Sequence, residues 1–241
     1  RGGVVWIPLQ IVTSAGPEPR GTLAREPELR PRVTTGVAAH PDRTTAILNA
    51  LREVVERDAA MIAWLARRPG ASIDPGSLGD DDVDELGRRL THAGLSYSLA
   101  RLVSDAPVPV VIAAVRDRSG VGPALALGTS AGTSIAAAAR KAVLEALMVW
   151  RLVRTIREGG TSAPRHPDAL DQRSRLLWWS SCDRWSDVGW LFAPATSPSA
   201  REDHAAADDL DALITWFRLA GEEVLVVDLA DEPTVQQLGH H

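Results

Sequence analysis

The sequence predicts an α/β fold, with α+β as its variant, in which long helices pack on a mixed sheet. Apolar residues recur at helical spacing in two long segments, 42–64 and 134–157. Short β-branched runs lie between and after these segments, so helices and strands mix along the chain. A chain of 241 residues is long enough to bury one core, so we expect a single domain over 1–241.

In the first half we expect an interrupted strand, a proline-rich loop, a long helix and, after a Gly/Pro/Asp break, a shorter helix. Pro8 breaks the apolar run of the strand, which favours an edge or a bulge. Asp42 or Thr44 supplies an N-cap for the long helix. The expected ranges are 4–12, 14–32, 42–64 and 83–90.

In the second half we expect two strands joined by a turn, a second long helix, a third helix and a closing strand. Gly159 and Gly160 end the second long helix. Residues 161–200 carry clustered tryptophans without a clean period and are expected to form an irregular connecting segment. The expected ranges are 110–115, 124–127, 134–157, 205–219 and 224–229.

Composition excludes several classes of protein. A single cysteine excludes an internal disulfide framework, and a net charge of −5 argues against a general nucleic-acid binder. Apolar runs stop well short of the roughly 18 residues that a membrane span needs. The histidines show no metal-ligand spacing with Cys182 or with each other.

The first candidate site is the segment LREVVERDA on the first long helix. Glu53, Glu56 and Arg57 lie three and four positions apart, so they share one helix face. Two carboxylates on one rigid face suit a Mg²⁺ ion that takes its remaining ligands from phosphates and water. The alternative is a solvated helix face with an internal Glu53–Arg57 pair.

The second candidate is Glu145, which lies among apolar residues on the second long helix. A buried carboxylate needs a partner, because an unpaired buried charge costs several kcal/mol. Lys141 or Arg140 on the same helix could supply that partner. Alternatively, Glu145 faces a metal ion or a nucleotide.

The third candidate is GTSAG at 128–132, which matches the G-x-S-x-G nucleophile elbow between a strand and a helix. Ser130 would be the nucleophile, with Asp228 and His240 or His241 completing a hydrolase triad. The sequence has no HGGG-like segment that would supply the second hydrogen-bond donor of an oxyanion hole. A tight turn before a helix explains the same glycines, so the serine hydrolase remains a distant alternative.

Taken in order, the segments resemble the YcaO-domain family. The run from Val33 to Ala38, VTTGVA, is similar to a T-S-N-G-x-A turn. The helical segment from Ala46 to Asp58 is similar to the pattern A-x-x-x-A-L-x-E-x-x-E-R-D. The strand pair and the helix carrying Glu145 look like the second half of that pattern. The stretch 221–239 looks like its closing strand.

The resemblance implies ATP- and Mg²⁺-dependent activation of peptide backbone amides. A Cys, Ser or Thr side chain of a precursor peptide attacks the preceding carbonyl, ATP phosphorylates the oxyanion, and loss of phosphate leaves a thiazoline or oxazoline. It also implies that Glu53, Glu56 and Glu145 hold the metal and nucleotide and that Arg57 orients Glu53 or meets a phosphate. The site would use positioning and charge neutralisation, as phosphoryl transfer requires.

The resemblance further implies a leader-peptide-binding partner protein, in a hetero-complex, or a homodimer. The net charge and the short apolar runs lead us to expect a cytoplasmic protein with neither nucleic acid nor a membrane as partner. Thr35 replaces the asparagine of the turn, and Met148 replaces a glutamine three residues after the helix glutamate. These departures favour one alternative, a non-catalytic relative that binds a peptide or a partner protein. A thioamide-forming enzyme of the same family, which needs an external sulfide source, is a further alternative. The missing first motif and proline-rich tail lead us to expect a piece of a longer domain.

Overall fold

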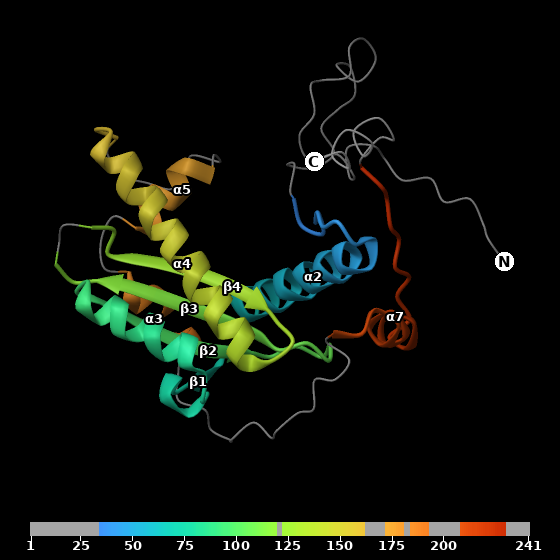
Figure 1. Cartoon of the computed structure of the whole chain (residues 1–241). Coiled ribbons are helices and arrows are strands. Elements are labelled where there is room, and N and C mark those ends of the chain that lie inside the picture. The colour runs from blue at the N-terminus through green and yellow to red at the C-terminus, as the bar shows by residue number, and fades with distance from the viewer. Residues whose placement is uncertain (1–33, 120–121, 162–171, 181–183, 193–207, 230–241) are drawn as a thin grey trace, which may run out of the picture.

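A computed structural model describes residues 34–119, 122–161, 172–180, 184–192 and 208–229. The expected strand at 4–12 and loop at 14–32 lie outside these residues. Figure 1 shows the arrangement of the elements. They are α2 (Arg43–Leu65), β1 (Ala71–Ile73), the 3₁₀ turn η2 (Pro75–Ser77), α3 (Asp81–His92), β2 (Leu95–Leu102), β3 (Val110–Asp117), β4 (Leu125–Ala131), α4 (Ile135–Glu158), α5 (Gln172–Trp179), α6 (Trp185–Val188), the 3₁₀ turn η3 (Gly189–Phe192) and α7 (Leu210–Leu219).

The four strands of the described residues form one sheet in the order β1-β2-β3-β4. Every neighbouring pair is antiparallel. The predicted combination of helices and sheet is confirmed, and it takes the α+β variant because neighbouring strands follow one another along the chain. β4 is the last strand in the order, which leaves one of its sides facing away from β3.

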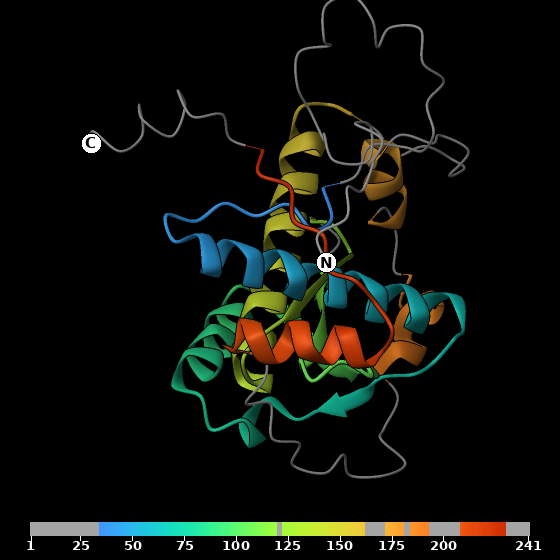
Figure 2. The ribbon, with the colours of Figure 1, turned by 90° about the vertical axis from the view of Figure 1, so that its right-hand side faces the viewer.

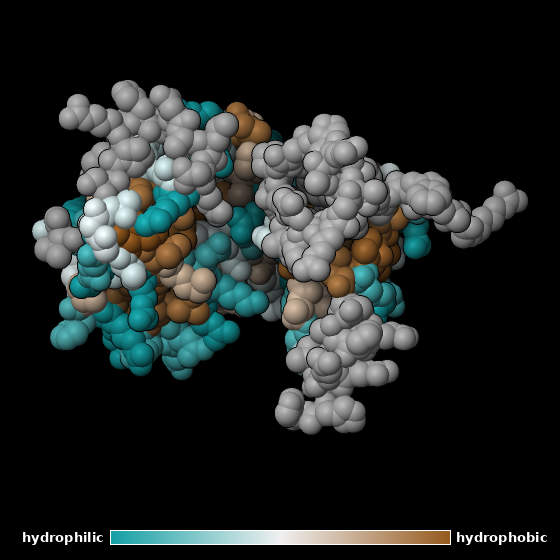
Figure 3. Space-filling view, turned by 90° about the horizontal axis from the view of Figure 1, so that it is seen from above, coloured by the Kyte–Doolittle hydropathy of each residue, from teal (hydrophilic) through white to brown (hydrophobic). Residues whose placement is uncertain are grey.

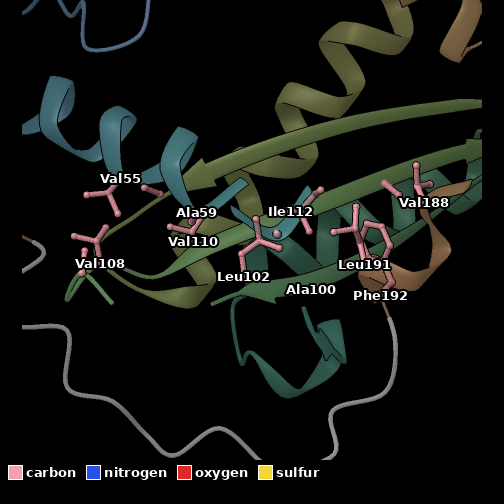
Figure 4. Packing of buried hydrophobic residues seen from close by; sticks show 14 of the residues in the cluster. Val55, Ala59, Ala100, Leu102, Val108, Val110, Ile112, Val188, Leu191 and Phe192 are labelled. Carbon is pink, nitrogen blue, oxygen red and sulfur yellow. The ribbon is translucent and has the colours of Figure 1, made fainter. Parts of the chain in front are cut away.

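A hydrophobic core lies on each face of the sheet, between the strands and the helices that cover that face. Val110, Ile112 and Ala114 of β3 pack with α2, α7 and the η3 region on one face. Val111 and Ala113 face α3 and α4 on the other, because successive side chains of a strand point to opposite faces. Figure 4 shows the first core, with Val55 and Ala59 of α2 above the strand residues. The layers are therefore helix, sheet, helix.

The two long helices begin where the sequence predicts. Asp42 caps α2 by accepting a hydrogen bond from the Thr45 amide at 2.7 Å, and Ser134 caps α4 by accepting one from the Ala137 amide at 3.1 Å. These caps satisfy amides that have no partner inside the helix. Both helices are long enough to cross the sheet and bring residues from their middles to its β4 edge (Figure 1).

Three expectations about local structure need correction. Gly128 to Ala131, expected in a turn, belong to β4. β2 and the short β1 were not predicted at all. Residues 224–229, expected to form a strand, are extended but pair with no strand of the described residues, and Asp228 forms an exposed ion pair with Arg43 at 3.2 Å.

The C-terminal helix α7 lies along α2, as Figure 2 shows. Arg52, which is mostly buried on α2, donates to Asp208 at 2.7 Å just before α7 and ties the two helices together. Within 161–200, the described residues contain α5, α6 and η3, and Leu177 and Leu191 are buried. The described tryptophans Trp179, Trp185 and Trp190 therefore pack against the hydrophobic core.

No helix in the described part of the chain is long and apolar enough to cross a membrane. Large apolar side chains are nevertheless exposed on both long helices, including Met61 and Leu65 on α2 and Leu144, Met148 and Leu152 on α4. Figure 3 shows apolar surface gathered in patches on the face that it presents.

Candidate nucleotide and metal site

Glu56 lies between helix α2 and the edge of strand β4. Its Oε1 accepts a hydrogen bond from the Thr129 hydroxyl at 2.7 Å, and its Oε2 accepts one from the Ala131 amide at 3.2 Å. Only 11% of its side chain is exposed. The carboxylate therefore does not belong to a solvated helix face, which was the alternative interpretation of this motif.

Glu145 approaches the same strand from α4, on the opposite side of the sheet. Its Oε2 accepts a hydrogen bond from the Thr129 amide at 3.1 Å. The helix partners considered from sequence lie elsewhere: Arg140 binds Asp82, and Lys141 is exposed. The α2 and α4 glutamates thus meet at Thr129, which donates to one carboxylate through its hydroxyl and to the other through its backbone amide.

Arg57 lies among three carboxylates. Its guanidinium nitrogens are 3.9 Å from Glu53, 3.7 Å from Glu56 and 3.7 Å from Glu145. These distances are longer than a direct hydrogen bond, so the arginine balances charge without a tight bidentate pair. Glu53 is oriented separately, because its Oε2 accepts from the Gly36 amide at 3.1 Å. The structure brings all four predicted site residues together.

The electrostatics of this cluster favour an additional cation. Burial raises the pKa of Glu56, more than the Thr129 hydrogen bond and Arg57 lower it. Burial likewise raises the pKa of Glu145, and the negative charge of Glu56 raises it further. Both groups hold their negative charge at a cost that a divalent cation would remove.

The donor set fits Mg²⁺ shared with phosphate groups. No three His, Cys, Asp or Glu side chains among the described residues close around one position as a complete metal cage. Mg²⁺ is commonly bound by one or two carboxylates, with waters and substrate phosphates as its other ligands. The side chains of Glu53, Glu145 and Arg57 are 25%, 35% and 47% exposed, so the site is open to a ligand on one side.

Sequence reasoning missed two groups that position the glutamates, the Gly36 amide and Thr129. Gly36 adopts φ +82°, a left-handed conformation that favours glycine, and it lies in a turn closed by the Val37 amide and the Thr34 carbonyl. The TTG motif was the available signal for it. Nothing in the sequence marks Thr129, because its role depends on the register of β4.

The hydrolase alternative finds no support in this geometry. Ser130 is buried within β4 and its hydroxyl donates to the Ala131 carbonyl at 3.1 Å, so it does not sit on a strand-to-helix elbow. Asp228 instead pairs with Arg43 on the surface, and His240 and His241 lie outside the described residues.

The family model described as YcaO cyclodehydratase, ATP- and Mg²⁺-binding, matches residues 1–241. The chain belongs to the YcaO family. Two curated proteins that are similar in sequence are both described as uncharacterised. One, from the tfuA 3' region of Rhizobium leguminosarum bv. trifolii, is 34% identical over 83 residues, 33% of this chain and 20% of the relative. The other, from Methanothermobacter thermautotrophicus, is 33% identical over 92 residues, 38% of this chain and 24% of the relative.

Two solved structures share the fold of this chain. A heterocyclase in complex with substrate and cofactor has a TM-score of 0.67 at 20% identity, covering 86% of this chain and 27% of that one. The E. coli microcin synthetase McbBCD complex with pro-MccB17 bound has a TM-score of 0.59 at 19% identity, and the match covers 78% of this chain and 48% of that one. The chain therefore spans a quarter to a half of these solved chains, and about a fifth to a quarter of the curated relatives.

The raised pKa of Glu145 predicts how its removal affects stability. A carboxyl whose pKa is raised by folding destabilises the fold increasingly as pH rises from its unfolded pKa through its folded pKa. Glu145→Gln keeps an oxygen that accepts from Thr129 but carries no charge. We expect this variant to have a higher Tm than the wild type at pH 7.5, with the difference vanishing near pH 4, in metal-free buffer.

Glu85→Gln is the matched control, measured by the same thermal scans. Hydrogen bonding to Arg89 and the charge of Arg88 lower the pKa of Glu85, so its stabilising contribution is present at neutral pH and is lost on acidification. We expect a Tm equal to or below that of the wild type at pH 7.5. A lower Tm for Glu145→Gln at neutral pH would contradict the assignment of Glu145 as a carboxylate held at a cost.

Proposed function

We propose that this chain carries the Mg²⁺-nucleotide site of a YcaO enzyme that activates peptide backbone amides and forms thiazoline or oxazoline rings. The observation that carries the proposal is the convergence of Glu53, Glu56 and Glu145 on Arg57 from helices on opposite faces of the sheet. Family membership supports it, because the family model is described as ATP- and Mg²⁺-binding. A precursor peptide and a leader-peptide-binding protein are the proposed partners.

Each residue would have a defined role. Glu56 and Glu145 would hold Mg²⁺, since both are fixed by β4 and both gain from a nearby cation. Glu53, fixed by the Gly36 amide, would complete the acidic face. Arg57 is the residue able to turn from the carboxylates toward a phosphate, because its contacts with them are long and half of its side chain is exposed. ATP, when bound, would turn an amide oxygen into a phosphate leaving group.

Thermal stabilisation by nucleotide tests this proposal. A ligand that binds only the folded state at 100 times its Kd stabilises it by about 2.7 kcal/mol. For a chain of this size that corresponds to a Tm increase of about 5–10 °C. We expect this increase with Mg²⁺ and ATP together, and little change with ATP in EDTA. Equal Tm values with and without Mg-ATP would contradict the proposal.

Two departures from the family pattern favour a second candidate, a non-catalytic relative that binds a peptide or a partner protein. Met148 is 69% exposed and offers no hydrogen-bond donor where the family pattern has a glutamine, and Thr35 likewise departs from the asparagine of the turn. We expect Met148→Gln to raise ATP hydrolysis if the chain is catalytic. Unchanged hydrolysis alongside unchanged peptide binding would favour the second candidate. A thioamide-forming enzyme would be separated from an azoline-forming one by its requirement for sulfide.

A further inference from the structure

An apolar pocket of about 230 Å³ lies along β4, beside the glutamate cluster. It is lined by residues of α2, α4, α5 and β4 and by Ser180, which follows α5, and none of these residues is charged. The lining residues are Trp64, Leu125, Ala126, Leu127, Val149, Leu176, Trp179 and Ser180. Trp64 and Trp179 form one wall in edge-to-face contact, with ring centroids 5.6 Å apart. The pocket therefore suits an uncharged, apolar group.

Leu125, Ala126 and Leu127 in this lining belong to β4, whose outer side pairs with no other strand of the described residues. The Gly132 amide donates to the Pro109 carbonyl, and the Asp117 amide donates to the Ala124 carbonyl. The even-numbered residues of β4 therefore form the main-chain hydrogen bonds with β3. In an antiparallel pair the residues between them direct their amide and carbonyl groups to the other side. Thr129 and Ala131 follow this rule, since their amides donate to Glu145 and Glu56.

Leu127 lies in the same outward register, inside the pocket. Its amide and carbonyl groups point away from β3. They form no hydrogen bond with another described residue. Unpaired main-chain groups on a strand edge are a template for another extended chain. The main chain of a peptide satisfies such an edge, while a neighbouring pocket selects one of its side chains.

We propose that the outer edge of β4 at Leu125 and Leu127 binds the substrate peptide as an added strand, with one apolar peptide side chain in the pocket. The inference rests on the proposed function only in identifying this peptide as the substrate. Leu127 and Thr129 point to the same face of the sheet. Because they are two residues apart, they are separated by about 7 Å along the strand. A peptide in this register presents a peptide unit to the glutamates and places an apolar side chain two residues away.

This geometry predicts a sequence preference. The enzyme selects substrates with a leucine-sized or larger apolar residue two positions from the modified Cys, Ser or Thr. A phosphate or a charged side chain is excluded from the pocket, because its lining offers no opposite charge. The competing occupant is a nucleoside base, and the experiment includes it.

Fluorescence anisotropy with labelled peptides tests the proposal on the full chain. The probe is fluorescein-Gly-Leu-Gly-Cys-Gly-Leu-Gly, compared with versions in which Ala or Asp replaces both leucines. Burial of a leucine side chain is worth about tenfold or more in affinity, so the Ala peptide binds about tenfold more weakly and the Asp peptide more weakly still. Single N-methylation along the Leu peptide weakens binding at every second residue only, because alternate residues bond to the neighbouring strand.

Two variants form a matched pair. Val149→Arg places a charge in the pocket, whereas Leu152→Arg places the same charge on α4 outside its lining. The first abolishes the preference for leucine over alanine, and the second preserves it. Circular dichroism checks that both variants fold. If Val149→Arg does not fold, the N-methyl series on the wild type still tests the proposal.

Equal affinity for the Leu and Ala peptides, uniform effects of N-methylation, or identical behaviour of the two arginine variants would overturn the proposal. So would displacement of the peptide by adenosine that disappears in Val149→Arg, because the pocket would then hold a base. Failure of the subsite is separable from failure of the proposed function. Mg-ATP stabilisation with no peptide selectivity rejects the subsite alone, and peptide selectivity without Mg-ATP stabilisation rejects the nucleotide site alone.

Discussion

Glu56→Gln is expected to lower Mg-ATP-dependent turnover of a peptide substrate by about 100-fold or more, as loss of one group that stabilises charge in a transition state usually does. Glu56 is the most buried of the clustered glutamates, and β4 fixes both of its oxygens. The substitution keeps the side-chain shape but removes the charge. Phosphate release and the loss of one water from the peptide, followed by mass spectrometry, measure this turnover and check the prediction.

Glu85→Gln is the control for this experiment. Glu85 lies on α3, pairs with Arg88 and Arg89, and takes no part in the cluster around Arg57. Its substitution removes the same charge from the chain as a whole, so turnover should stay close to that of the wild type. Comparable turnover by Glu56→Gln and Glu85→Gln would show that Glu56 has no direct role.

Gly128→Ala is expected to destabilise the fold by about 3 kcal/mol, at the upper end of the usual cost of overpacking. A Cβ at this position would lie 2.4 Å from both the Ala142 carbonyl oxygen and the Ala146 amide nitrogen, which are backbone atoms of α4. The backbone has to move, because no flexible side chain can give way. A Tm reduction of about 6–12 °C follows for a chain of this size.

Gly76→Ala is the matched control for the glycine substitution. The same added methyl at Gly76 meets only an Asp74 oxygen at 3.8 Å, which is an ordinary contact. Its Tm should stay near that of the wild type. A Gly128→Ala Tm within a degree or two of Gly76→Ala would contradict the close packing of β4 on α4 and, with it, the position from which Glu145 reaches the strand edge.

The long helices could be predicted because their signals are local. The caps Asp42 and Ser134 and the 3.6-residue period are contained in the sequence of each helix. β2 could not be predicted in the same way. Helices cover both faces of the sheet, so neighbouring residues Leu99 and Ala100 are both buried and the alternation that marks a half-exposed strand is lost.

The prediction for segment 224–229 was wrong in the opposite sense, because a strand was expected there and none is found. Its β-branched composition is typical of strands, but a strand requires a partner, and none of the described strands pairs with it. Leu225, Val226 and Val227 are consequently about half exposed. Composition alone therefore cannot determine whether an apolar extended segment joins a sheet.

The site could be predicted in its residue types but not in its geometry. Helical spacing places Glu53, Glu56 and Arg57 on one face. That Glu145 joins them depends on the sheet lying between α2 and α4 and on the register that aligns Thr129 with Ile112. The resemblance to a family grouped these residues, whereas spacing alone favoured a solvated helix face with an internal ion pair.

Calorimetric titration of the protein with a non-hydrolysable ATP analogue in Mg²⁺ buffer tests the central claim most directly. The claim is that the glutamates around Arg57 hold Mg²⁺ and nucleotide. We predict binding by the wild type and by Glu85→Gln, and at least about tenfold weaker binding by Glu145→Gln, in line with losses at metal sites. Binding of equal strength by the wild type and Glu145→Gln would contradict the claim.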